Sequence, residues 1–425
     1  MKRFNLIPII LMQLILSLLE LNGQEEDLKY GKTPDEMFPY DKFQKAYIYH
    51  FVKPTQFYGA GREKLPPADL TEVRLGLLAP LEGSIMTPQG IQMLQGTTLA
   101  IEEANKKGGY KGLPFKLMAH NDVGLWGAAA NEIVKMDDEG VWAWVGSLDD
   151  INSHVAIRVT LKLEIPMMSP ADPDPTFTET NIPWVFRNIS DDRQSSYALV
   201  NYIYKKEGHK RIAVIRANNR YGRVGIMEFR DAAQRIGFPI VIEVRFNDGE
   251  TNFISQLESI KKTKADAIVI WGNDKESALI LKQIRKMGMK QPVFGSDRMV
   301  SPIFFKIAGS YAENIVTTCQ YNPEANDPKL KAFQTNYKKR FGIEPDVFAA
   351  HSYDAMNLFI EAIYKVGLNR ALIRDVLSDF KTFQGYKGVT GEIIFDASLN
   401  DIGEIFYAEV KNGKFIFYPT SDIIK

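Results

Sequence analysis

The residues able to do chemistry are spread thinly along this chain, and none forms a familiar catalytic motif. The sequence holds one cysteine and five histidines, which stand far apart. It contains no G-x-S-x-G elbow, no phosphate-binding G-x-x-x-x-G-K-[ST] loop and no H-E-x-x-H zinc helix. Cys319 ends the apolar run 315–319, which predicts a small buried side chain rather than a nucleophile. We therefore predict no catalytic residue, no metal site and no cofactor.

Polar, glycine-containing loops hold the remaining candidate residues. The loops span residues 80–90, 146–152, 169–174, 218–222, 271–274 and 295–298. Each of them follows an apolar run, so each should lie at the carboxyl end of a strand. Ligands of open α/β sheets bind at that edge, which makes these loops the expected ligand site. Because any loop has a similar composition, the loops alone do not establish a site.

Apolar runs and helical periodicity alternate from Val73 onward and predict the elements that position these loops. The first series has strands at 73–78, 115–118, 142–145 and 165–168, with helices at 90–107, 127–138 and 152–163. The second has helices at 194–206, 223–236, 253–262 and 275–287, with strands at 211–215, 241–244, 267–270 and 292–294. Later helices at 329–341, 348–366 and 370–380 precede strands at 391–395, 405–410 and 415–418. Strands separated in this way form parallel sheets, so the fold class is α/β with two doubly wound lobes.

The composition is that of a soluble globular protein. The chain has 425 residues, of which 45% are hydrophobic and 24% charged, so a long disordered protein is excluded. Lys and Arg number 52, as do Asp and Glu, and the formal net charge is zero. No overall positive field exists to attract nucleic acid, and we do not expect a nucleic acid partner.

The N-terminus has the pattern of a secretory signal peptide. Basic residues in 1–3 precede a mostly apolar run, 4–19, and a polar segment, 20–24. Cleavage is expected near Gly23; the alternative, a retained anchor, is weakened by polar residues within the run. We therefore predict a mature protein without a membrane span. An exported protein without disulfides fits a bacterial periplasm, which is the predicted location.

A segment rich in aromatic residues separates this leader from the lobes. It spans residues 24–71 and contains Tyr40, Phe43, Tyr47, Tyr49, Phe51, Phe57 and Tyr58. Exposed aromatic side chains at this density favour aggregation, so the segment is expected to lie against the main body. It either covers surface or serves as a docking segment for a partner.

Several short pieces of the chain resemble one family. The pieces are 77–83, 96–109, 145–147, 165–171, 186–194, 221–222 and 351–355. In their order and spacing they are similar to the type I periplasmic binding proteins, the branched-chain amino acid (Leu/Ile/Val) binding family of ABC importers. The resemblance runs from about Val73 to about Tyr418. No single piece is specific, whereas their joint order is.

The resemblance implies two Rossmann-like lobes with parallel-rich sheets, joined by three crossovers. The crossovers are expected near 188–191, 318–321 and 397–401. The implied division is a signal peptide (1–23), the N-terminal extension (24–71), lobe one (72–190 and 319–398), lobe two (191–318), and the return strands of lobe two with the tail (399–425).

The resemblance also implies a set of ligand contacts between the lobes. In lobe one, Gln89 occupies a position that often contacts the ligand, and Ala171 is kept beside positions that grip an α-carboxylate. In lobe two, Tyr221 keeps a family aromatic residue, and Asp297 keeps the acid that receives an α-ammonium group. The full predicted set is Gln89, Asp150, Ala171, Asp172, Tyr221, Asn273, Asp297 and Phe348.

This sequence departs from the family where the α-carboxylate should lie. Asp149, Asp150, Asp172 and Asp174 crowd that place, and a ligand carboxylate beside unpaired aspartates is costly in a poorly solvated cleft. This argues for a cationic or neutral polar ligand, such as an amine, amide or polyol. The alternative is that these aspartates cap helices or face solvent. For Tyr221 the alternative is simple packing.

The resemblance implies an exported solute-binding protein that closes on a small ligand by hinge motion and passes it to an ABC permease. Two alternatives remain: a sensor or accessory receptor for a membrane partner, and an exported hydrolase on the same scaffold. A DNA-binding regulator of related fold is disfavoured, because no helix-turn-helix precedes Val73 and the signal peptide exports the chain.

Overall fold

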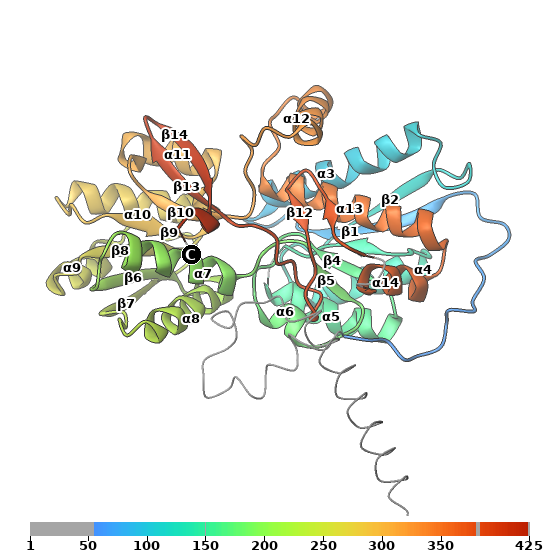
Figure 1. Ribbon diagram of the computed structural model, residues 1–425, viewed down its shortest axis with the longest axis horizontal. Helices are drawn as coiled ribbons and strands as arrows, with labels where there is room; N and C mark the ends of the chain where they lie inside the picture. The colour runs from blue at the N-terminus through green and yellow to red at the C-terminus, as the bar shows by residue number, and fades with distance from the viewer. Residues whose placement is uncertain (1–54, 149, 380–382, 424–425) are drawn as a thin grey trace, which may run out of the picture.

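The computed structural model describes residues 55–148, 150–379 and 383–423, which form two α/β lobes lying side by side (Figure 1). Each lobe has its own sheet with helices on both faces. The chain crosses between the lobes three times, near the middle of the molecule. The predicted fold of two Rossmann-like lobes with parallel-rich sheets is confirmed. The predicted signal peptide and the aromatic residues from Tyr40 to Phe51 lie outside the described residues.

Lobe one contains a five-stranded parallel sheet with the order β2-β1-β3-β4-β5. Its strands are β1 (Val73–Ala79), β2 (Phe115–Asn121), β3 (Trp144–Val145), β4 (Met167–Ser169) and β5 (Val185–Arg187). One face packs on α3 (Thr87–Lys106), α12 (Pro328–Phe341), α13 (Val347–Val366) and α14 (Arg370–Ser378). The other packs on α4 (Trp126–Asp138) and α5 (Asp150–Leu163), and a short α6 (Thr176–Glu179) follows β4. Burial on both faces explains why the inner strands β1, β3 and β4 are mostly apolar, whereas the edge strand β2 carries polar residues.

Lobe two contains a seven-stranded sheet with the order β14-β13-β10-β9-β8-β6-β7. Its parallel strands are β6 (Ile212–Ala217), β7 (Ile242–Phe246), β8 (Ala267–Trp271), β9 (Val293–Gly295) and β10 (Val316–Cys319), and its antiparallel return strands are β13 (Phe406–Lys411) and β14 (Lys414–Pro419). One face packs on α9 (Ile254–Lys262), α10 (Asp274–Lys286) and α11 (Pro302–Ala308), and the other on α7 (Asp192–Val200) and α8 (Arg220–Arg235). Short 3-10 turns η3 (Asp297–Met299), η4 (Gly309–Ala312) and η5 (Thr420–Asp422) complete the lobe.

The helix predicted over 194–206 is present, but its second half is π-helical rather than α-helical. α7 ends at Val200, and a π-helical segment, η2 (Asn201–Lys206), continues it. The amide side chain of Asn201 donates to the carbonyl oxygen of Tyr197 (2.8 Å). In a regular α-helix that carbonyl oxygen accepts the backbone N–H four residues later. A side chain inserted into the ladder is a recognised cause of local helix irregularity.

Two of the three crossovers meet at a buried arginine. The first runs from β5 into α7, the second from β10 into α12, and the third from the small β11–β12 pair (Tyr386–Lys387 and Glu392–Ile393) into β13. Arg187 at the end of β5 is fully buried. Its guanidinium donates to Asn400 Oδ1 on the third crossover (2.7 Å) and to Asp191 Oδ2 on the first (3.2 Å). Arg187 also donates to the carbonyl oxygen of Asp174, and so ties two crossovers to lobe one.

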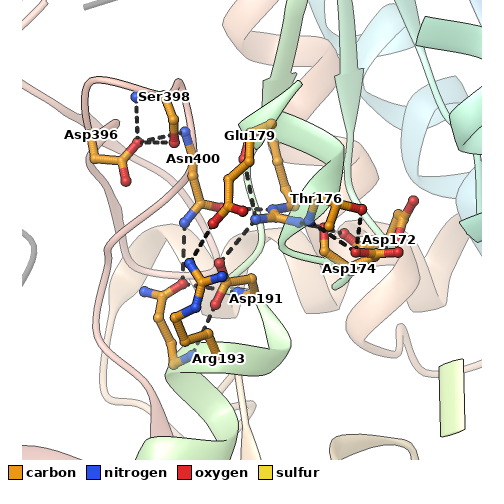
Figure 2. Close-up of polar contacts among 12 residues, drawn as sticks. Asp172, Asp174, Thr176, Glu179, Asp191, Arg193, Asp396, Ser398 and Asn400 are labelled. Carbon is orange, nitrogen blue, oxygen red and sulfur yellow. Dashed lines mark hydrogen bonds and ion pairs between the residues drawn. The ribbon is translucent and has the colours of Figure 1, made fainter. Parts of the chain in front are cut away.

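A buried carboxylate organises the third crossover. Asp396 Oδ1 accepts hydrogen bonds from the Ser398 hydroxyl (2.7 Å), the Ser398 N–H (2.9 Å) and the Asn400 N–H (3.1 Å) (Figure 2). Asp396 is 3% exposed. Burial raises its pKa to about 6, and repulsion from Asp191 adds to the rise, although its hydrogen bonds oppose it.

Asp396→Asn is expected to remove a pH dependence of stability. Because the folded-state pKa is raised, folding favours the protonated acid. The contribution of Asp396 to stability is therefore fully present below about pH 4 and is lost as the pH rises through about 6. Asn keeps the Oδ1 acceptor but does not titrate. Relative to wild type, the variant should therefore gain on the order of 3 kcal/mol between pH 4 and pH 7. Urea unfolding across this range measures the difference, and a pH-independent offset would contradict the assignment.

The N-terminal extension lies against the outside of lobe one in residues 55–72 (Figure 1, blue). The rings of Phe57 and Trp184 lie 4.6 Å apart, and Arg62 forms an ion pair with Asp375 (2.5 Å). Asn369 donates to the carbonyl oxygen of Gly61 (2.8 Å). The expected contact with the main body is confirmed for Phe57, Gly61 and Arg62. For Tyr58 the expectation is wrong, because this residue is 88% exposed.

Candidate functional site

Lobe two brings four polar side chains together at the carboxyl ends of its strands. Tyr221 lies in the first turn of α8, and Asn219 caps that helix by accepting the Gly222 N–H (2.9 Å). Asn273 ends the β8–α10 loop, and Asp297 with Arg298 follows β9. The carboxyl ends of parallel strands meet at one edge, and the sequence pattern therefore placed three of these residues correctly side by side.

Their contacts form a connected cluster. The Tyr221 hydroxyl donates to Asp297 Oδ1 (2.6 Å), and the Arg298 guanidinium lies 3.6 Å over the Tyr221 ring. Arg298 also donates to Asn273 Oδ1 (2.7 Å). Burial and the neighbouring Asp297 raise the pKa of Tyr221 well above its usual value, so the phenol stays protonated and donates. Tyr221 is thus both a packed residue and a positioned hydrogen-bond donor; Arg298 was not predicted.

Lobe one has a cluster of buried polar side chains at the carboxyl ends of its strands, which the sequence did not reveal. Ser147, after β3, donates to Asp122 Oδ2 after β2 (3.0 Å), and both side chains are fully buried. Ser169 at the end of β4 donates to the Ser147 carbonyl oxygen (3.3 Å) and accepts the Asp172 N–H (3.1 Å). Burial raises the pKa of Asp122. Single polar residues at strand ends give no sequence signal beyond their position.

The expectation that Asp172 and Asp174 stand unpaired is wrong. Asp174 is 1% exposed, and its Oδ2 accepts from Arg220 of lobe two, with a nitrogen–oxygen distance of 2.5 Å. Asp172 is fully buried, and its Oδ1 accepts the Asp174 N–H (3.0 Å). These two aspartates therefore build a turn and an interlobe ion pair. Ala171, beside them, is also buried.

The Arg220–Asp174 ion pair belongs to a small interlobe group. Arg220 Nη2 also lies 3.0 Å from Thr176 Oγ1 and 3.1 Å from His154 Nε2, both in lobe one. Nearer the crossovers, Arg193 of α7 pairs with Glu179 of lobe one and with Glu228 of α8 (Figure 2, Glu179 and Arg193). Burial raises the pKa of Glu228 to about 7 despite this pairing, whereas the two acids raise that of Arg193. The lobes are therefore held in contact by charged groups.

The other predicted contacts lie on lobe one. Gln89 is half-buried in the first turns of α3, and its Oε1 has no hydrogen-bond partner within the described residues. Phe348 is half-buried at the start of α13, and packs on the lobe-one core. Asp150 begins α5, but its side chain lies outside what is described. Within the described chain, no hydrogen bond joins Gln89 to the Tyr221–Asp297 pair.

The side chains of the lobe-two cluster can hold a polar ligand through positioned hydrogen-bonding groups. Cys319 is buried, as predicted, and burial raises the pKa of its thiol to about 12. Across residues 55–148, 150–379 and 383–423, no group of three or more His, Cys, Asp or Glu side chains could hold a metal ion. No helix in this part of the chain is both long and apolar enough to cross a membrane.

Comparisons with known proteins agree with the two-lobe α/β fold. The family model for periplasmic binding proteins matches residues 72–413. "Leu/Ile/Val-binding protein homolog 2" of Brucella abortus is 24% identical over 354 residues, covering 82% of this chain and 93% of that protein. Among solved structures, Streptococcus pneumoniae LivJ in complex with isoleucine has a TM-score of 0.75 at 25% identity, covering 82% of this chain and 99% of LivJ.

A benzoate complex of a solute-binding protein from R. palustris shares the fold, with a TM-score of 0.73 at 19% identity, covering 82% of this chain and 96% of that one. The family model, the curated relatives and the solved structures thus agree on the family and the fold. The chain belongs to the periplasmic binding protein family, in the type I group that includes the Leu/Ile/Val-binding proteins.

Proposed function

We propose that this protein captures a small polar ligand between its lobes by hinge closure and delivers it to an ABC importer. The observation that carries the proposal is that polar side chains lie at the carboxyl ends of the strands in both lobes, and that an ion pair joins the two lobes. A ligand that touches both edges favours the closed state, which couples binding to the change that a permease can detect. Among the described residues the arrangement consists of positioned hydrogen-bonding groups, which supports transport rather than catalysis.

We further propose an amino acid as the ligand class, with amides and amines as the neighbouring possibilities. Asp297, held by the Tyr221 hydroxyl, would receive an ammonium group. Because Arg220 neutralises Asp174, the charge that opposed a ligand carboxylate is smaller than the sequence implied. The LivJ complex with isoleucine supports the same class.

The place of action proposed is the periplasm, reached through cleavage near Gly23. The segments 72–190 and 319–398 are proposed for lobe one, with 191–318 and 399–425 for lobe two. The partner proposed is an ABC permease. A receptor that reports its ligand to another membrane partner is the second candidate, favoured by the extension fixed to lobe one through Phe57 and Arg62.

A thermal-shift screen of the chain from residue 24 onward tests the proposal, with amino acids, amides, amines, benzoate and sugars in the panel. A ligand at 100 times its Kd should add about 2.7 kcal/mol of stability. Silence across the panel would contradict small-ligand capture and favour the partner-dependent receptor.

For a panel hit, Asp297→Asn is expected to weaken binding at least tenfold, because a charged hydrogen bond contributes about 1.5–3 kcal/mol. Tyr221→Phe should weaken binding by a smaller factor, since it removes only the group that orients Asp297. Calorimetric titration measures both. Tyr311→Phe, on an exposed tyrosine of the same lobe, is the matched control. Unchanged affinity in Asp297→Asn would place the ligand elsewhere.

A further inference from the structure

A cavity lies among the crossovers, apart from the residues of the proposed cleft site. Its volume is about 320 Å³. Ser190 lines it from the first crossover, Gln320 from the second, and residues 401–404 with Phe406 from the third. His351 of α13 and residues 390–394 complete the wall. None of the eight predicted ligand contacts lines it. We call it the crossover pocket.

Two buried side chains in the wall of the crossover pocket present unused hydrogen-bond acceptors. His351 is 2% exposed and Gln320 is 3% exposed. His351 Nε2 and Gln320 Oε1 have no hydrogen-bond partner within the described residues. His351 Nδ1 lies 2.9 Å from the Asn188 carbonyl oxygen, so Nδ1 carries the proton and donates it.

Burial lowers the pKa of His351 to about 4, although carbonyl groups of Asn188 and Gln320 oppose the shift, so the ring is neutral at pH 7. Nε2 is then a lone-pair acceptor. Gln320 uses its amide N–H toward Ser195 Oγ (3.4 Å), which leaves its carbonyl oxygen as an acceptor. Buried acceptors without a partner are costly, and a ligand with N–H donors would relieve that cost.

The rest of the wall is acidic and apolar. Glu392 and Glu404 are exposed at the pocket, and none of the described residues that line it is Lys or Arg. Glu404 Oε1 accepts from Ser421 (2.9 Å), while the buried Asp401 carboxylate accepts the Ile394 and Gly403 N–H groups (3.0 and 2.8 Å). Apolar surface comes from Ile393, Ile394, Ile402 and Phe406.

We propose that the crossover pocket binds a primary alkylammonium ion, with its N–H groups on His351 Nε2 and Gln320 Oε1 and its alkyl chain along the isoleucines. The glutamates at the pocket supply the favourable potential for the cation. An anion is disfavoured by the same charges, and a neutral alcohol lacks both the charge and enough donors for two acceptors.

Such a ligand would contact all three crossovers at once. Hinge motion changes the relative positions of the three crossovers, so the ligand must prefer one lobe arrangement over the other. Linkage then requires the ammonium ion and the cleft ligand to change each other's affinity by the same factor. Binding in the pocket is itself independent of the proposed transport function.

Calorimetric titration of the full mature chain with n-butylammonium chloride tests the site. One molecule is expected to bind per chain, whereas n-butanol and tetramethylammonium, which lack the charge and the N–H donors respectively, should bind at least tenfold more weakly. The double variant Glu392→Gln/Glu404→Gln should lose at least tenfold in affinity. Glu258→Gln, at an exposed glutamate of α9, is the matched control and should bind like wild type.

Two further variants separate this site from the cleft. Gln320→Met removes one buried acceptor and should weaken n-butylammonium binding; Asp297→Asn should leave it unchanged. Loss of binding in Asp297→Asn would show that the cation occupies the cleft and would overturn the proposal. Equal binding of n-butanol, wild-type affinity in the glutamate double variant, or a crystal structure with only water in the pocket would also overturn it.

Discussion

Replacing Arg187 by methionine is expected to lower the free energy of unfolding by about 3–5 kcal/mol, because it removes one partner of a buried ion pair. Arg187 is fully buried, and Asp191, its partner, is 5% exposed. The arginine also bonds Asn400 on the third crossover and the carbonyl oxygen of Asp174. Loss of the guanidinium leaves the buried Asp191 carboxylate and the Asn400 amide oxygen without that donor. Urea unfolding at pH 7 measures the effect.

The double variant Arg187→Met/Asp191→Asn should recover part of this loss, since the uncompensated charge is then absent. A double-mutant cycle isolates the pair from the other contacts of Arg187. Arg340→Met is the matched control: Arg340 pairs with Glu102 on the surface and should change stability little. If the double variant were as unstable as the sum of the two single variants, the charge pair would not be the source of the effect.

The sequence predicted the fold well because its signals are local. Alternation of buried strands such as Val73–Ala79 with helices specifies βαβ units, and their handed connections leave few arrangements of each lobe. The Tyr221–Asp297 contact followed from the same logic, since both residues come after parallel strands of one sheet.

The predictions from the sequence that failed concern contacts between the lobes. Asp174 reads as an unpaired acid in its own loop, yet its partner Arg220 follows a strand of the other lobe. No periodicity connects two loops whose proximity depends on how the lobes dock. The same holds for Glu179 and Arg193, and for the crossover pocket, whose walls come from four distant segments. Interlobe electrostatics is therefore the part of the site that only the tertiary structure reveals.

The Arg220–Asp174 pair should control how far the lobes separate without ligand. Asp174 is 1% exposed, and the Arg220 side chain is 27% exposed. Breaking a buried pair costs about 3–5 kcal/mol, and the partial exposure of Arg220 reduces this to about 1.5–3 kcal/mol. Arg220→Gln should therefore shift the open-to-closed ratio roughly ten- to a hundredfold toward open, because each 1.4 kcal/mol is tenfold.

Small-angle X-ray scattering of ligand-free protein checks this shift through the radius of gyration, which should rise in Arg220→Gln. Arg223→Gln, one turn further along α8 on an exposed position, is the control and should scatter like wild type. A ligand in the cleft must then supply the free energy of closure that the ion pair no longer provides. Its apparent Kd should therefore rise by a similar factor in Arg220→Gln. An unchanged radius together with unchanged affinity would show that the ion pair follows closure and does not govern it. If closure is governed by this pair, the acids that seemed to repel a ligand carboxylate instead serve to hold the lobes around it.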